Sequence, residues 1–268
     1  MTHWFADLVP QRHLIAIDFF QVHWYGVLVV GAIVVVYMLI RRLYLRDHEN
    51  DRDIVDLIFQ VVVFGLIGAR FWHVFVFQWG YYSLHLAEIL MLWRGGIAIQ
   101  GALLAGVLTT YFFAKRRKLS VWKLLDYLAV PLPLGQAIGR WGNFFNQELY
   151  GKPTDAPWGI FIEPENRLSG FENVDFYHPA FFYESLLSFI FFYLLWRLAR
   201  KRRADGFLVS IYLVGYGVIR FVVDFIRIDP MPAFSGLRLS QWISMVFIFA
   251  GAAFLIQKTA HQPRGRPR

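Results

Sequence analysis

Three arginines lie inside long apolar stretches of this 268-residue chain: Arg70, Arg140 and Arg220. An arginine at the centre of a membrane helix costs at least about 2.5 to 3.5 kcal/mol on insertion scales, so three of them need a reason. The planar guanidinium fork matches a phosphate ester better than the point charge of lysine does. These residues therefore predict a site for a phosphate-bearing ligand, and inside a membrane the natural ligand is a phospholipid headgroup.

Arg220 belongs to a polar stripe on one predicted helix face. Tyr216, Arg220, Asp224 and Arg227 fall within roughly 80° of one another at about 3.6 residues per turn. An ion pair between Asp224 and either arginine would lower the insertion cost. Asp224 neutralises only one of the two arginines, so we expect positive charge to remain for an external anion.

The composition excludes several other kinds of site. The chain is 57% hydrophobic and has no cysteine, so a disulfide, a thiolate nucleophile or a cysteine metal site cannot form. The histidines lack the spacing of metal ligands, and we expect neither a metal nor a cofactor. The formal charge of +8 resides in short clusters between apolar runs. Such clusters indicate membrane topology rather than nucleic-acid binding.

Seven apolar runs are long enough to cross a bilayer, which needs about 20 residues. They cover approximately residues 21–40, 54–77, 96–114, 121–141, 179–197, 206–226 and 239–257. Lipid offers the backbone no hydrogen-bond partner, so every run should be a helix. We predict an all-α integral membrane protein with seven transmembrane helices, forming one polytopic domain over 1–268. Residues 142–178, between helices four and five, should form a small external subdomain with short strands.

Lysines and arginines cluster after the first, third, fifth and seventh runs. The positive-inside rule therefore places the N-terminus outside and the C-terminus in the cytoplasm. In this orientation the three arginines lie about 20 to 30 Å from the cytoplasmic ends of their helices, near the outer interface. The residues predicted at the same level are Tyr25, Gln100, His178, Tyr183 and Glu184. The simpler explanation for these polar residues is that each side chain extends to water by itself at the membrane surface. That explanation is weaker for three arginines that all have glycines nearby.

The stretch "GRWGNFFNQELYG" resembles the signature of the prolipoprotein diacylglyceryl transferases of bacterial inner membranes. The resemblance extends in family order to "HWYG", "GLIGARFWHV", "WRGGIAIQGALLAG", "HPAFFYES", "YGVIRFVVDFIR" and "LSQWISM". It implies transfer of the diacylglyceryl group from phosphatidylglycerol to the thiol of a lipobox cysteine in a prolipoprotein. A thioether forms and glycerol phosphate leaves, at an active site that faces the outer leaflet.

The resemblance also implies roles for individual residues. Arg140 and Arg220 would clamp the phosphate, Asn143, Asn146 and Glu148 would shape the pocket just outside it, and Gly151 would end the turn. Tyr25 and Tyr216 would donate hydroxyl hydrogen bonds. We add Arg70, His178, Glu184 and Asp224 as further substrate-binding residues because of their predicted depth.

One position departs from the family pattern. Where relatives carry the histidine proposed as the base, this chain has Gln100, whose amide cannot accept a proton at physiological pH. The base is then Glu148 or Asp224, or deprotonation is left to water or the lipid phosphate. A divergent member with altered activity is the remaining option.

Two other functions fit the same residues. A lipid transporter or flippase would use the arginines to bind a headgroup, but no internal repeat and no second polar station toward the cytoplasm support it. A non-catalytic lipid-binding homologue is suggested by Gln100 alone.

The charge pattern makes a direct prediction about topology. A reporter enzyme fused after Arg268 should be active only in the cytoplasm, and one inserted beside Ser169 only outside, because lysine and arginine are retained on the cytoplasmic side. Activity assays with compartment-specific reporters measure this. The reverse pattern would move the arginines to the inner leaflet and overturn their proposed role.

Overall fold

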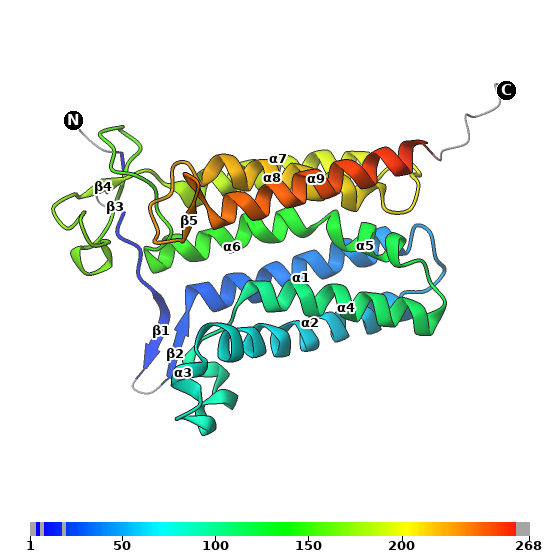
Figure 1. Cartoon of the computed structure of the whole chain (residues 1–268), viewed down its shortest axis with the longest axis horizontal. Helices are drawn as coiled ribbons and strands as arrows, with labels where there is room; N and C mark the ends of the chain where they lie inside the picture. The colour runs from blue at the N-terminus through cyan, green and yellow to red at the C-terminus, as the bar shows by residue number, and fades with distance from the viewer. Residues whose placement is uncertain (1–3, 6–7, 18–19, 261–268) are drawn as a thin grey trace. The chain divides into compact units, whose positions relative to one another are not determined.

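The computed structural model describes residues 4–5, 8–17 and 20–260 of the chain. The chain divides into two compact units. One consists of Met1–Leu39 and Leu128–Arg268, and the other of Ile40–Tyr127. We call them the α6–α9 unit and the α2–α4 unit after their principal helices (Figure 1). The C-terminal part of the basic tail, residues 261–268, lies outside the described residues.

Helices occupy every run that the sequence predicts to be helical. The longer helices are α1 (Trp24–Tyr44), α2 (Arg52–Trp72), α4 (Ile99–Arg117), α5 (Val121–Ala129), α6 (Leu132–Asn146), α7 (Ala180–Leu198), α8 (Phe207–Val223) and α9 (Leu239–Ala260). Short helical turns are η1 (His73–Phe77, a π-helix that continues α2), α3 (Trp79–Tyr82), η2 (Leu86–Leu90), η3 (Leu92–Arg94) and η4 (Pro164–Asn166). The prediction of a mainly helical protein is confirmed.

Four helical segments of the described chain are long and apolar enough to cross a membrane. They are Trp24–Tyr44, Arg52–Phe77, Ala180–Leu198 and Leu239–Lys258, and the apolar helix Phe207–Val223 is shorter. Large side chains such as Phe59, Phe249 and Ile256 are exposed on these helices, as a lipid environment requires. The protein is therefore a helical membrane protein, and seven crossings stay a prediction.

One predicted run is not a single helix. Residues 121–141 divide into α5 and α6 at Val130 and Pro131. Proline has no amide hydrogen and its ring clashes with the preceding turn, so the helix cannot continue through Pro131. Helix α6 begins directly after it, with Pro133 in its first turn.

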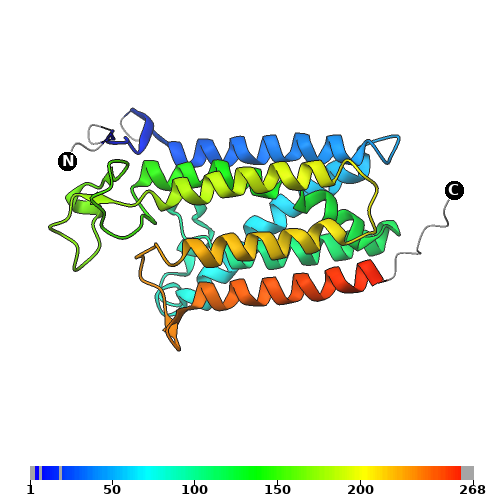
Figure 2. The same ribbon diagram turned by 90° about the horizontal axis from the view of Figure 1, so that it is seen from above.

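Glycines bring helices into backbone contact in both units. In the α2–α4 unit, a Cβ on Gly101 would lie 2.1 Å from the carbonyl oxygen of Gly68. In the α6–α9 unit, a Cβ on Gly217 would lie 2.9 Å from the carbonyl oxygen of Ser244, where α8 packs on α9. Helix α6 in turn packs on α7, and α7 on α8 (Figure 2). Close packing through small residues is the usual way in which membrane helices associate.

The segment after α6 has a small core of its own. Strands β3 (Ile160–Phe161) and β4 (Phe176–Tyr177) pair antiparallel, and a cluster that includes Tyr150, Ile162 and Tyr177 is buried beneath them. The Tyr150 hydroxyl donates to the Asn166 carbonyl and accepts from the Leu168 amide. These contacts order a loop that the sequence predicts to lie outside the membrane.

Two strand pairs lie where the sequence analysis did not expect them. Strands β1 (His13–Ile17) and β2 (Phe20–His23) form a hairpin directly before α1, and β5 (Ala233–Phe234) pairs with β6 (Leu237–Arg238) before α9. Each pair leads the chain into the first turn of a long helix.

The Gly68–Gly101 contact generates a stability prediction. Gly101→Ala should lower the unfolding temperature in detergent, because the added methyl group meets a backbone oxygen and overpacking costs about 1 to 3 kcal/mol. Gly106→Ala is the matched control on the same helix, since its Cβ would lie an ordinary 3.6 Å from Val61. Equal unfolding temperatures for both variants would contradict the close approach of α2 and α4.

Candidate functional site

A single buried carboxylate joins the arginines of the α6–α9 unit. Glu184 lies in the second turn of α7 and only 1% of it is exposed. Its Oε1 is 2.7 Å from Nη2 of Arg140 on α6, and its Oε2 accepts a hydrogen bond of 3.1 Å from Nη1 of Arg220 on α8. The contact therefore ties three helices together through opposite charges.

Asp224 and Arg227 extend this cluster beyond the end of α8. Asp224 Oδ1 is 3.0 Å from Nη2 of Arg220 and 3.9 Å from Nε of Arg227. Nη1 of Arg227 lies 4.0 Å from Glu184 Oε2. The ion pairs expected between Asp224 and its neighbouring arginines are thus present. We call Arg140, Glu184, Arg220, Asp224 and Arg227 the arginine cluster.

The arginine cluster carries more positive than negative charge, since three guanidinium groups face two carboxylates. Tyr216 lies on the same face of α8 as Arg220, as the polar stripe in the sequence predicts. Its hydroxyl is within hydrogen-bonding reach of Arg140. One excess positive charge in a buried site favours a monoanionic ligand.

The turn after α6 holds a carboxylate next to the arginine cluster. Gln147 and Leu149 both have positive φ, at 52° and 57°, and reverse the chain between them. Glu148 Oε1 accepts hydrogen bonds from Nδ2 of Asn143 at 2.8 Å and of Asn146 at 3.1 Å. The Asn143 side-chain oxygen in turn accepts from Arg140 at 3.3 Å. The side chain of Asn143 therefore links Glu148 to Arg140.

A second layer of charges supports Arg227. Asp229 Oδ1 is 2.7 Å from Nε of Arg227, and its Oδ2 is 3.5 Å from Nη2 of Arg238. Burial disfavours the charged form of Asp229, but the hydrogen bond from Arg227 and the two arginine charges hold its pKa below the ordinary value. Arg238 also donates to the carbonyl of Arg227 at 3.1 Å. Through these contacts Asp229 and Arg238 hold the loop after α8, which carries Arg227, in place.

Gly151 joins this loop to the segment before α7. Its amide donates to the carbonyl of His178 at 2.8 Å, and the next amide, of Lys152, donates to the carbonyl of Ile226 at 2.8 Å. A Cβ on Gly151 would lie 2.7 Å from Ile226 Cγ2 and 2.8 Å from His178 Cβ. Only glycine fits without displacing one of the two segments.

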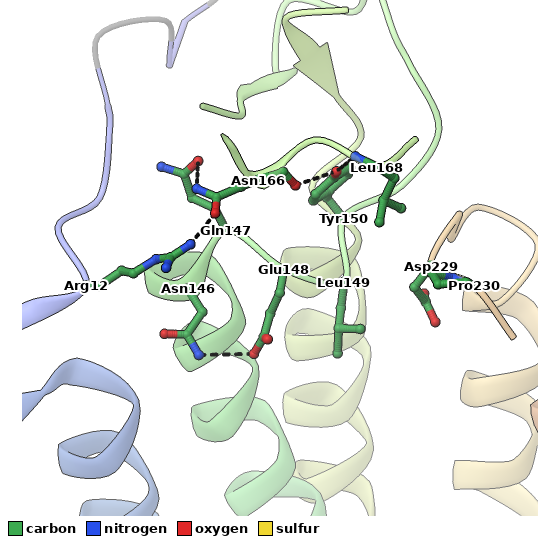
Figure 3. Close-up of a pocket in the computed structure, with 10 residues that line it drawn as sticks. All are labelled: Arg12, Asn146, Gln147, Glu148, Leu149, Tyr150, Asn166, Leu168, Asp229 and Pro230. Atoms are coloured by element: carbon green, nitrogen blue, oxygen red, sulfur yellow. Dashed lines mark hydrogen bonds between the residues drawn. The ribbon is translucent and has the colours of Figure 1, made fainter. Parts of the chain in front are cut away.

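A cavity of about 330 Å³ opens beside Glu148 (Figure 3). Both polar and apolar groups line it, and they come from the N-terminal segment, the turn after α6, the external segment and the loop after α8. The lining residues are Arg12, Asn146, Gln147, Glu148, Leu149, Tyr150, Asn166, Leu168, Asp229 and Pro230. Figure 3 shows the hydrogen bond from Asn146 to Glu148 on its wall. The cavity therefore adjoins the arginine cluster through Glu148 and Asp229.

Tyr25 and His178 also belong to the α6–α9 unit. The Tyr25 ring packs directly on Gly142, where a Cβ would lie 2.4 Å from Cδ2 of the ring. Nδ1 of His178 is 3.1 Å from the hydroxyl of Tyr183, and burial lowers the pKa of His178. Both side chains have neighbours that fix their positions beside the turn after α6.

Arg70 differs from Arg140 and Arg220 in how its donors are used. It lies in the α2–α4 unit, 6% exposed, and donates five hydrogen bonds to backbone carbonyls. The acceptors are Glu88, Ile89, Met91, Gly95 and Gly96. A guanidinium has five N–H groups, so none remains for an anion. This geometry favours a structural role for Arg70, which fastens the segment before α4.

Gln100 lies in the first turn of α4, also in the α2–α4 unit, and its side chain is exposed. Among the residues that the structure describes, no group of His, Cys, Asp and Glu side chains could hold a metal ion. All residues of the arginine cluster and of the cavity lining belong to the α6–α9 unit.

Known proteins resemble this chain over nearly all of it. The family model described as prolipoprotein diacylglyceryl transferase matches residues 12–257. The chain belongs to the prolipoprotein diacylglyceryl transferase family.

Three similar proteins are named phosphatidylglycerol–prolipoprotein diacylglyceryl transferase. The one from Fervidobacterium nodosum is 37% identical over 259 residues, which is 94% of this chain and 87% of the relative. The one from Acaryochloris marina is 38% identical over 93% of this chain and 91% of the relative. The one from Thermosynechococcus vestitus is also 38% identical, over 88% of this chain and 88% of the relative.

The geometry groups most residues for which the resemblance implied a role in this transferase family. Those that meet in or beside the arginine cluster are Arg140, Asn143, Asn146, Glu148, Tyr216 and Arg220. Asp224 and Glu184, added for their predicted depth, are part of the same cluster. The sequence analysis did not propose Arg227, Asp229 or Arg238 as site residues. Arg227 lies on the polar stripe but just beyond the sixth apolar run, and nothing in the sequence indicates that it is only 7% exposed.

The bridging position of Glu184 generates a stability prediction. Glu184→Gln keeps the shape of the side chain but leaves Arg140 and Arg220 without their shared anion. Breaking a buried ion pair from one side costs roughly 3 to 5 kcal/mol. We expect a clearly lower unfolding temperature in detergent, measured by intrinsic tryptophan fluorescence. Glu165→Gln, at an exposed carboxylate of η4, is the control and should leave it unchanged. Equal stability of both variants would show that Glu184 does not hold the helices together.

Proposed function

We propose that this protein transfers the diacylglyceryl group of phosphatidylglycerol to the thiol of a lipobox cysteine in a prolipoprotein. The names of the similar proteins give phosphatidylglycerol and a prolipoprotein as the two substrates and diacylglyceryl as the transferred group, which supports this proposal. The reaction forms a bond between the thiol sulfur and the terminal glycerol carbon of the lipid. The bond between that carbon and the phosphate oxygen breaks, and glycerol phosphate leaves with the bonding electrons.

The observation that carries the proposal is the incomplete use of the guanidinium donors in the arginine cluster. Contacts with Glu184, Asn143 and Asp224 orient Arg140 and Arg220 through their Nη1 and Nη2 atoms. Each guanidinium has five N–H groups, so even with Tyr216 within reach of Arg140, the contacts among the residues that the structure describes leave further donors for a phosphate. The two arginines come from different helices, α6 and α8, and are held at one place before any ligand binds.

Preorganised positive charge is what this reaction needs. Negative charge grows on the departing phosphate in the transition state, and donors already in position stabilise it without reorganisation. Burial strengthens the effect, because few water molecules compete. Arg140 and Arg220 are therefore the proposed phosphate clamp, and Arg227 adds a third positive charge behind them.

The cavity beside Glu148 suits the polar headgroup. Its wall offers amide and carboxylate groups of Asn146, Asn166 and Glu148, which can hydrogen-bond a glycerol diol. A diester phosphate at the arginine cluster would extend its headgroup glycerol into this space. The leaving group would then be held at both ends, at the phosphate and at the glycerol.

Glu148 is the best-placed carboxylate for accepting the thiol proton. It is exposed, and its described hydrogen bonds come from neutral amides. Asp224, in contrast, is buried and lies against Arg220 and Arg227, at 3.0 Å and 3.9 Å, so the protein itself encloses it and a substrate thiol has less access to it. Gln100 has no basic atom, so its proposed contribution is a hydrogen bond to a substrate.

The membrane setting of the proposal follows from charge distribution and depth. With the proposed seven crossings, external N-terminus and cytoplasmic C-terminus, the arginine cluster would lie near the outer leaflet of a bacterial inner membrane. The cavity and the external segment 142–178 then face outward. A secreted prolipoprotein, still attached by its apolar signal segment, would present its cysteine on that side.

The clamp generates the principal activity prediction. Arg140→Ala or Arg220→Ala should lower the rate of thioether formation by about 100-fold or more, which is typical for removal of a charge-stabilising donor. Lysine at either position should rescue poorly because the fork is lost. The assay mixes purified protein, phosphatidylglycerol and a lipobox peptide, and detects the thioether-linked mass increase.

Arg197→Ala is the matched control, since Arg197 lies at the opposite end of α7 and donates only to Tyr193 in a described contact. Wild-type turnover by either clamp variant would overturn the proposed role. Lipid movement without thioether formation by the wild-type protein would instead support a transporter, and lipid binding alone would support a non-catalytic homologue.

A further inference from the structure

A second polar contact lies deeper in the α6–α9 unit than the arginine cluster. Nε2 of Gln136 on α6 donates a hydrogen bond of 2.9 Å to the hydroxyl of Tyr212 on α8. Gln136 precedes Arg140 by four residues, and Tyr212 precedes Tyr216 by four. At a rise of about 1.5 Å per residue, the contact lies about one helical turn from Arg140 and Tyr216, away from the external segment.

The hydrogen-bonding capacity of this pair is not used up. Oε1 of Gln136 is buried and has no hydrogen-bond partner among the residues that the structure describes. The pair contains three N–H or O–H hydrogens in total, and the described contact uses one. The oxygen and nitrogen of an amide are hard to distinguish. With the two exchanged, Tyr212 donates to the amide oxygen, and the buried atom without a described partner is the amide nitrogen, which carries two unused hydrogens. Unused donors buried in a membrane protein indicate a ligand, because lipid tails cannot satisfy them.

The surroundings connect this pair to the arginine cluster. The rings of Tyr212 and Tyr216 are parallel, with centroids 5.8 Å apart, so the two hydroxyls follow the same face of α8. Gly139 lies between Gln136 and Arg140 on α6, and a Cβ there would meet nothing within 4 Å. A ligand that reaches from one level to the other would therefore meet no obstructing atom at Gly139 of α6.

We propose that Gln136 and Tyr212 bind the ester carbonyl oxygens of the diacylglyceryl donor. This inference rests on the proposed function. In a diacyl phospholipid the ester carbonyls are separated from the phosphate by the glycerol carbons. That separation is comparable with one helical turn, about 5.4 Å. Ester carbonyls only accept hydrogen bonds, and the pair has donors to spare.

The consequence is a lipid held at two depths. Arg140 and Arg220 hold the phosphate, and Gln136 and Tyr212 hold the ester groups. The carbon that the thiolate attacks lies between them. Gln136 and Tyr212 are positioning residues, since they touch the donor but not the reacting atoms. Holding this carbon in position lowers the entropic part of the activation barrier, because the thiol meets it already in a reactive geometry.

The alternative is that the pair only joins α6 to α8, as interhelical hydrogen bonds do in membranes. A lipid without ester carbonyls separates the two roles. Diether phosphatidylglycerol has the same phosphate and headgroup, but each ester is replaced by an ether, which lacks the carbonyl oxygen. The full-length protein is assayed with a lipobox peptide and each lipid in turn, and kcat/KM is measured for thioether formation.

We expect the wild-type protein to prefer the diester lipid by about 5- to 100-fold, the range for one or two hydrogen bonds. Tyr212→Phe keeps the ring packing, and Gln136→Leu keeps most of the volume. Each should lower kcat/KM for the diester lipid several-fold while leaving the diether value unchanged, so the preference falls. Tyr193→Phe, at an exposed tyrosine of α7, is the control and should keep the wild-type preference.

Equal loss on both lipids would show that the pair only supports the fold, and a wild-type protein without preference would also overturn the inference. Both results leave the proposed function intact, because thioether product still forms. Absence of that product from either lipid with the wild-type protein would overturn the proposed function and this inference together. If Gln136→Leu does not fold, the nearly isosteric Tyr212→Phe decides alone.

Discussion

The shared carboxylate of Glu184 is the contact on which the site depends. It brings Arg140 and Arg220 together from α6 and α8, although like charges repel and both side chains lie within apolar helices. Without an anion between them, two partly buried guanidinium groups would separate or draw in water. Glu184 neutralises one of these charges. The arginine cluster as a whole still carries an excess positive charge, which a phosphate diester can balance.

Backbone turns at the ends of α6 and α8 complete this arrangement. The left-handed residues Gln147 and Leu149 fold Glu148 back onto Asn143, and the loop after α8 returns Arg227 to Glu184. Gly151 fastens the two turns to each other because its missing side chain lets three segments meet. A cavity with polar groups in its wall therefore adjoins a charged site at the end of an apolar bundle.

The helices and the two central arginines were predictable from sequence, because apolar length and an isolated charge inside a run are local signals. The division of run 121–141 at Pro131 could also have been predicted, since a helix cannot continue through proline. Hydropathy alone does not reveal it, because the residues on both sides are apolar. What sequence could not distinguish was Arg70 from Arg140. Both are arginines in apolar runs after glycines, yet the donors of Arg70 are taken by carbonyls of residues 88–96. Arg227, Asp229 and Arg238 were missed because their burial arises from tertiary folding of two loops.

The most direct test of the account is a structure of the full-length protein with phosphatidylglycerol bound. The account predicts phosphate oxygens within about 3 Å of guanidinium nitrogens of both Arg140 and Arg220, with Glu184 still between the two side chains. The headgroup glycerol should occupy the cavity beside Glu148. A phosphate bound elsewhere, for example at Lys152, with Arg140 and Arg220 contacting only protein groups, would contradict it.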